Sequence, residues 1–253
     1  MENTIQILGD RTALTTQGGL VGTVSNEQTG LLQPFNLSCG RASEKTAVNK
    51  DGLLYDVSPY EPSVTYVDGV GVLNTEPSAE NLITYSEDFS QWEERNSATT
   101  SLNNSVINPK GIQGSYVISN ADGNNISNNI INKVALVSSN TEYTFSAWVK
   151  NINATEMDIR IRDNSTGSIP RFNHQFNGNE WTRISVTSTT GSSTSSIRVL
   201  FGGADGDFYV WGAQVEQGSQ ATSYIPTNGQ TATRLADTGF QTPDLSQYIN
   251  SES

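Results

Sequence analysis

Residues 143–150 read Tyr-Thr-Phe-Ser-Ala-Trp-Val-Lys, and this stretch decides the fold of the chain. Successive side chains of a β-strand point to opposite faces, so Tyr143, Phe145, Ala147 and Val149 share one face. One apolar face is typical of an antiparallel sheet that buries only one side. The stretch therefore predicts a strand of a β-sandwich.

Four further segments extend the same pattern. Apolar side chains occupy every second position in residues 157–162, 181–187 and 196–201, whereas residues 208–215 are apolar on both faces. The polar stretches between them, such as residues 163–167, are expected to be turns. No long amphipathic helix interrupts the series, which argues against an α/β enzyme fold. The predicted fold class is all-β, an antiparallel β-sandwich.

The 253-residue chain is predicted to have four regions. Residues 1–40 hold brief apolar patches, which indicate short strands or an extended arm; this region either packs against a partner or forms a loosely attached edge. Residues 41–77 form a connecting β segment with two Asp-Gly turn signals. Residues 78–227 form the sandwich, and residues 228–253 form a polar tail.

The charge balance and the rare residue types restrict the function. A net charge of −12 disfavours nucleic acid as a partner, because phosphate backbones require clustered Lys and Arg. Cys39 is the only cysteine, so an intrachain disulfide and Cys-based zinc sites are excluded. No apolar run is long enough to cross a membrane and no signal peptide is visible, so synthesis in the cytoplasm is expected.

Several segments resemble, in order and spacing, a domain of bacteriophage head-spike, fibre and tail proteins. The resemblance covers about residues 41–237, and its motifs lie at residues 41–52, 74–77, 81–92, 143–150, 211–218 and 221–227. It implies a jelly-roll sandwich akin to carbohydrate-binding modules, following an N-terminal arm. Such modules often carry acidic calcium ligands in the last strand. Here that strand reads Tyr-Val-Trp-Gly at residues 209–212, so no cofactor is expected and structural calcium is not supported.

The candidate ligand-binding residues are Trp148, Arg160, Arg162, Tyr209 and Trp211. Aromatic rings stack on sugar faces, and guanidinium groups donate hydrogen bonds to hydroxyls or to acidic sugars. The alternative, which we favour, is that the tryptophans fill the core or a subunit contact, because buried aromatic area dominates such packing.

Catalytic and metal-binding residues are not expected. Acidic side chains cluster at residues 87–94, where they could hold calcium or form a carboxylate pair, but a solvated loop explains them as well. His174 is the only histidine, and no nucleophile-elbow motif accompanies it. The sequence therefore predicts a protein that is not an enzyme.

The predicted function is that of a bacteriophage virion structural protein, a head fibre or decoration protein on the capsid surface. Its expected partners are other capsid proteins and further copies of itself, with a trimer as the first expectation. Weak binding of host or mucus glycans is compatible with this role. The alternative is a tail-fibre adhesin whose main task is to bind carbohydrate on the host surface.

Overall fold

A computed structural model of the chain describes residues 5–7, 20–25, 32–37, 39–120 and 130–238, and the side chains of residues 39–119 and 131–238. Two compact units are present. The first unit comprises residues 1–78 and 234–253, and the second, the sandwich, comprises residues 79–233. Across the described ranges, no helix is long and apolar enough to cross a membrane.

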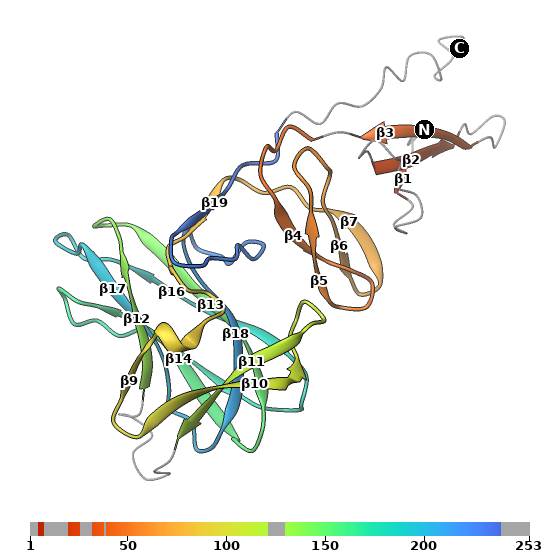
Figure 1. Cartoon of the computed structure of the whole chain (residues 1–253). Helices are drawn as coiled ribbons and strands as arrows, with labels where there is room; N and C mark the ends of the chain where they lie inside the picture. The colour runs from red at the N-terminus through yellow and green to blue at the C-terminus, as the bar shows by residue number, and fades with distance from the viewer. Residues whose placement is uncertain (1–4, 8–19, 26–31, 38, 121–129, 239–253) are drawn as a thin grey trace. The chain divides into compact units, whose positions relative to one another are not determined.

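Two five-stranded antiparallel sheets make up the sandwich (Figure 1). The β13 sheet contains, in spatial order, β10 (Ala98–Ile107), β11 (Gln113–Asn120), β18 (Phe208–Gln217), β13 (Glu142–Asn151) and β16 (Thr182–Thr189). The β14 sheet contains β15 (Arg171–Gln175), β14 (Glu156–Asp163), β17 (Ser196–Gly202), β12 (Ile130–Leu136) and β9 (Glu93–Arg95). The chain crosses repeatedly between the sheets, which is the jelly-roll arrangement.

The core lies between these sheets and confirms the predicted alternation. Each predicted inward position is buried there, including those of β13, β14, β16 and β17. The Phe145 ring of one sheet meets the Phe201 ring of the other edge-on, with centroids 5.4 Å apart. Phe201 also contacts Phe89 and Trp92, whose own rings stack at 4.8 Å. Phe89 lies in a short 3-10 helix, η2 (Phe89–Gln91).

A β-bulge at Gly212 interrupts the alternation of side chains along β18. The register between β13 and β18 shifts at this point, so Trp211 faces outward while Ala213 returns to the core. Gly212 has a φ of +63°, and a Cβ atom there would lie 2.9 Å from the Trp148 ring. Glycine is therefore required both by the backbone conformation and by the neighbouring ring.

Five strands of the two sheets were not predicted, namely β9, β10, β11, β12 and β15. Strand β10 reads Ala-Thr-Thr-Ser-Leu-Asn-Asn-Ser-Val-Ile and lies at the edge of its sheet. Most of its side chains are exposed or half-buried, so hydrophobic periodicity does not mark it. Its position is fixed instead by main-chain pairing with β11.

The first unit is built from hairpins. Strands β1 (Ile5–Ile7), β2 (Leu20–Ser25) and β3 (Leu32–Leu37) form a three-stranded sheet, and two further hairpins join β4 (Lys45–Val48) to β5 (Leu54–Val57) and β6 (Val64–Val67) to β7 (Val70–Leu73). Both Asp-Gly turn signals are confirmed. At the second, Asp68 and Gly69 have φ values of 50° and 79°, the conformation that a two-residue hairpin requires.

Residues 234–238, which were predicted to belong to the polar tail, are hydrogen-bonded into the first unit. Asp237 pairs with Arg41 and Lys45, and Gly40 donates its N–H to the Thr238 carbonyl oxygen at 2.6 Å. Just before them, β19 (Ala232–Arg234) pairs with β8 (Ala79–Asn81). The part of the tail beyond residue 238, and the side chains of residues 1–38, lie outside the described residues.

Candidate functional site

The outer face of the β13 sheet carries the two predicted tryptophans. Trp148 and Trp211 are direct register partners on β13 and β18, with ring centroids 5.5 Å apart. Tyr224 packs against both rings, at 5.4 and 4.8 Å. The two tryptophans are only 9% and 2% exposed, so they are part of a second small aromatic core.

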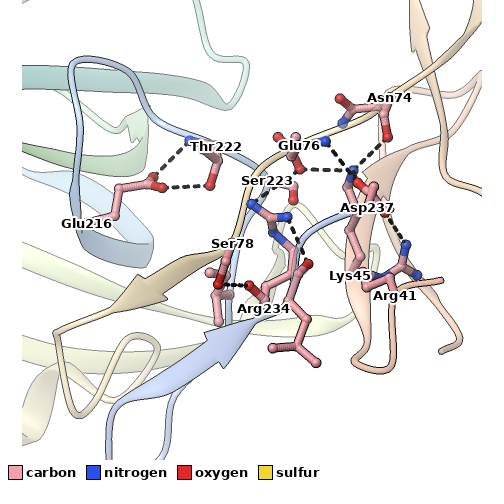
Figure 2. Close-up of polar contacts among 12 residues, drawn as sticks. Arg41, Lys45, Asn74, Glu76, Ser78, Glu216, Thr222, Ser223, Arg234 and Asp237 are labelled. Atoms are coloured by element: carbon pink, nitrogen blue, oxygen red, sulfur yellow. Dashed lines mark hydrogen bonds and ion pairs between the residues drawn. The ribbon is translucent and has the colours of Figure 1, made fainter. Parts of the chain in front are cut away.

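Residues 221–227, here called the cover segment, lie over this aromatic cluster. Thr222 donates from its backbone N–H and its hydroxyl to the Glu216 carboxylate, at 2.8 and 2.6 Å (Figure 2). The N–H of Ile225 bonds to Gln214 at 2.8 Å. The outward polar residues of β18 thus hold the cover segment in place, and the sheet face beneath it is closed to ligand.

Arg183 completes the closure of this face. Its guanidinium group lies 4.4 Å from the centre of the Trp148 ring, a cation–π contact. It also donates to the Thr222 carbonyl oxygen at 2.6 Å and to the Ser146 hydroxyl at 3.0 Å. A partly buried cation with these contacts holds the cover segment against the sheet.

Tyr209 lies on the same face, two residue pairs further along the strands. It is half-buried and stands opposite Lys150 on β13. The half-buried Trp181 ring approaches it at 6.5 Å and donates its indole N–H to the Ile107 carbonyl oxygen at 2.8 Å. These two rings are the aromatic groups of this face that remain partly accessible.

The predicted arginines lie on the opposite side of the sandwich. Met157, Ile159 and Ile161 of β14 point into the core, so Arg160 and Arg162 point out from the β14 sheet. The five predicted residues therefore do not form one surface, because β13 and β14 belong to different sheets.

Two further arginines, which were not predicted, join them on this outer face. Arg171 of β15 stands directly opposite Arg160, and Arg198 of β17 stands directly opposite Arg162. We call these four residues the arginine face. Arg162 and Arg171 are exposed, Arg198 is half-buried and Arg160 is buried. The sequence pattern does place Arg198 outward, between Ile197 and Val199, but the strand register is not visible in it.

Asp158 is the acidic residue at the centre of this face. Its carboxylate accepts a hydrogen bond from the Arg160 Nη2 atom at 2.8 Å and lies 3.9 Å from the Arg171 guanidinium. Within the described ranges, Arg162 and Arg198 form no ion pair. The Arg198 Nε atom is buried and has no hydrogen-bond partner there, and the same holds for the Oδ1 atom of Asn132.

The acidic residues predicted as a cluster at residues 87–94 form hydrogen bonds with different partners. Asp88 accepts hydrogen bonds from Ser90 and from the Tyr116 hydroxyl at 2.7 Å, whereas Glu94 accepts one from Thr100. Across residues 39–119 and 131–238, no group of three or more His, Cys, Asp or Glu side chains is arranged to hold a metal ion. His174 is half-buried beside Phe176, and burial lowers the pKa of its imidazole.

Two five-stranded antiparallel sheets that enclose one core define a jelly-roll β-sandwich domain. The chain belongs to the carbohydrate-binding domain family, whose model matches residues 77–207, more than half of its length. The matched range contains β14, β15 and β17 and ends just before β18, which carries Trp211. No curated protein sequence is a significant match to the chain.

Solved structures with a similar fold include a bacteriophage protein and sugar-binding modules. The enzymatically active domain of bacteriophage CBA120 tailspike protein 4 is 15% identical, with a TM-score of 0.40 over 54% of this chain and 21% of that chain. The CBM22-1–GH10 modules of Clostridium thermocellum xylanase 10B, complexed with xylohexaose, are 14% identical, with a TM-score of 0.43 over 59% of this chain and 30% of that chain. TmCBM61, in complex with β-1,4-galactotriose, is 12% identical, with a TM-score of 0.41 over 55% of this chain and 99% of that chain. The chain thus spans less than a third of the first two.

Proposed function

We propose that this chain is a non-catalytic adhesin that binds glycans of a bacterial surface or of mucus. The match of the carbohydrate-binding domain model to residues 77–207 is the observation that carries the proposal. The outer face of the β14 sheet is the proposed binding surface, because the cover segment occupies the part of the other outer face that holds Trp148 and Trp211.

The test is retention of the purified 253-residue chain on an array of bacterial surface polysaccharides and mucin glycans. We expect retention on a subset of them. If the folded chain is retained on none, the proposal is wrong. Incubation with a retained polysaccharide is expected to release no fragments; release would reveal a catalytic activity.

A pair of bulky substitutions identifies which outer face of the sandwich binds the glycan. Val134 is 46% exposed on the outer side of β12, and Thr99 is exposed on the outer side of β10 in the other sheet. Val134→Trp is expected to reduce glycan retention by blocking the β14 sheet, while Thr99→Trp leaves it unchanged. The reverse pattern would move the site to the β13 sheet.

A second candidate function is that of a structural protein on the capsid surface, a head fibre or decoration protein. The order and spacing of the motifs at residues 211–218 and 221–227, which resemble those of phage head-spike and fibre proteins, favour it. In this role residues 1–40 attach the chain to other capsid proteins or to its own copies, with a trimer expected, and the sandwich is displayed outward. The two functions are compatible.

Light scattering on the purified chain and mass spectrometry of purified phage particles test this second function. A trimer that is present in the particles supports it. A monomer that is missing from the particles contradicts it.

A further inference from the structure

We infer that the arginine face recognises an acidic polysaccharide, one whose sugar units carry carboxylate or sulfate groups. The inference deepens the proposed function and rests on it. The four residues concerned, Arg160, Arg162, Arg171 and Arg198, lie on three adjacent strands, β15, β14 and β17.

The register creates two pairs of like charges. Arg171 faces Arg160, and Arg198 faces Arg162, each directly across adjacent strands. Like charges in directly opposed positions destabilise a sheet. Positive charge is also concentrated on this face, because it holds four of the chain's 14 Lys and Arg residues although the net charge of the chain is −12. A bound anion would turn this unfavourable arrangement into a favourable one.

The charges of the face are only partly neutralised by the protein itself. Asp158 is bonded to Arg160 and lies near Arg171, as described above. Glu156, at the end of the face, accepts a hydrogen bond from Gln175 at 2.6 Å. No carboxylate of the described residues pairs with Arg162 or Arg198, and the buried Nε atom of Arg198 lacks an acceptor. The unmet donors point to an anionic ligand.

The shape of the charged region fits a polymer with repeated anionic groups. Adjacent strands lie about 5 Å apart, so a band over three strands extends about 10 Å across the sheet. Arg160 and Arg162 are two residues apart, which adds about 7 Å along the strand. Guanidinium groups bind carboxylates and sulfates through paired hydrogen bonds, and the existing contact between Arg160 and Asp158 shows this geometry.

Stacking on aromatic rings is not the mode of recognition on this face. Among the described outward side chains of its strands there is no aromatic residue. The apolar outward residues near Arg198 are Val134, its register partner on β12, Leu136, which is 78% exposed, and the buried Leu200, the register partner of Arg160. Charge and hydrogen bonds, supported by these aliphatic groups, therefore provide the selectivity.

The experiment compares the binding of the 253-residue chain to three soluble polymers by affinity electrophoresis and calorimetry. Polygalacturonate carries carboxylates, dextran sulfate carries sulfates, and dextran is neutral. We expect binding to at least one anionic polymer, weakened by added NaCl because salt screens exposed charges, and no binding to dextran. Comparison of the two anionic polymers identifies which group is bound.

Variants locate the binding. The double variant Arg162→Ala/Arg198→Ala is expected to bind the anionic polymer at least about tenfold more weakly, because it removes hydrogen bonds to a charged group. Arg162→Lys/Arg198→Lys keeps the charge but loses the paired geometry, so it is expected to recover only part of the affinity. Lys50→Ala, which removes an exposed charge in the first unit, is the control and should bind as the wild type does.

Several results would overturn the inference. Equal binding to dextran and to the anionic polymers, unchanged affinity in the double alanine variant, or equally tight binding of duplex DNA would each do so. Because the salt titration uses the wild-type chain, its result tests the inference even if a variant misfolds. If neutral glycans bind and acidic ones do not, only this inference fails; if no glycan binds at all, the proposed function fails with it.

Discussion

Asp237 and Arg41 are separated by 196 positions in the chain, yet their side chains form a fully buried ion pair with an Nη1–Oδ1 distance of 2.7 Å. The other carboxylate oxygen of Asp237 accepts from the Lys45 ammonium at 2.7 Å and from the Glu76 N–H at 2.9 Å (Figure 2). Burial alone would raise the pKa of Asp237, but the hydrogen bonds from Lys45, Arg41 and Glu76 lower it. One carboxylate therefore joins three segments of the first unit.

Substitution of Asp237 by Asn is expected to destabilise the first unit strongly. Arg41 would remain buried without its counter-charge, and of its two ion pairs Lys45 would keep only the one with Glu76. Removal of one partner from a buried ion pair costs about 3–5 kcal/mol. Hydrogen exchange followed by mass spectrometry checks this through the protection of residues 45–73. Asp51→Asn, at an exposed turn position of the same unit, is the control. Unchanged protection in the Asp237 variant would contradict the prediction.

Asp163 gives the sandwich a stability that depends on pH. Its buried carboxylate accepts hydrogen bonds from the Gly191 N–H at 2.8 Å, the Thr194 hydroxyl at 2.7 Å and the Ser165 N–H at 2.8 Å. Burial alone would raise the pKa of Asp163, but these hydrogen bonds, with one from the Thr166 N–H, hold it well below its ordinary value. A lowered folded-state pKa stabilises the protein above the unfolded pKa, about 3.9, and this stabilisation is lost as the pH falls.

The expected result is a melting temperature that falls between about pH 5 and pH 2.5 in the wild type, and falls less steeply in Asp163→Asn. The variant is also less stable at pH 7, because it loses the charge-assisted hydrogen bonds. Calorimetric scans at several pH values provide the measurement. The control is Glu142→Gln, which removes an exposed carboxylate from β13, in the other sheet of the sandwich. It should keep the wild-type dependence of melting temperature on pH.

Gly212→Ala is expected to destabilise the sandwich by about 1–3 kcal/mol. The substitution combines an unfavourable positive φ with a Cβ atom 2.9 Å from the Trp148 ring. Gly167→Ala is the matched control, since Gly167 has a φ of +73° but nothing within 4 Å of an added Cβ. The difference in unfolding free energy between the two variants measures the crowding at Trp148 alone. Equal losses would show that the ring moves aside freely.

Trp148→Ala and Trp211→Ala are each expected to cost about 3–5 kcal/mol, the range for removing a large buried ring. Both rings are packed against Tyr224 beneath the cover segment. Tyr209→Ala, at a half-buried position of the same face, should cost much less. Urea unfolding and glycan retention are measured together. A Trp148 variant that keeps its stability but no longer binds glycan would place the site on the β13 sheet.

Four strands of the sandwich could be predicted because their inward positions recur at every second residue, and a fifth, β18, because its run is apolar on both faces. Tyr143 to Val149 is the clearest case, and every inward residue predicted there is buried in the core. Strand β10 could not be predicted, because an edge strand of Thr, Ser and Asn buries too little apolar surface to show a period of two. Its position depends on hydrogen bonds to β11, which no local pattern encodes.

The candidate site was predictable only in part, for a similar reason. Alternation places Arg160 and Arg162 on the outer side of β14 once Ile159 and Ile161 face the core. The partners Arg171 and Arg198 come from strands whose pairing and register depend on the whole sheet. Trp148 and Trp211 are buried because Tyr224, which is distant in the sequence, packs over them.

By itself, the sequence determined the fold class and the direction in which most sandwich side chains point, since both follow from a local period of two along each strand. The tertiary structure alone decided which outer face is closed and which residues share the open one. Trp148 and Trp211 became a small core because a later segment folds over them, and four arginines became one face because strand register brought them together. These outcomes depend on pairing between residues far apart in the chain, which side-chain alternation along a single strand does not specify.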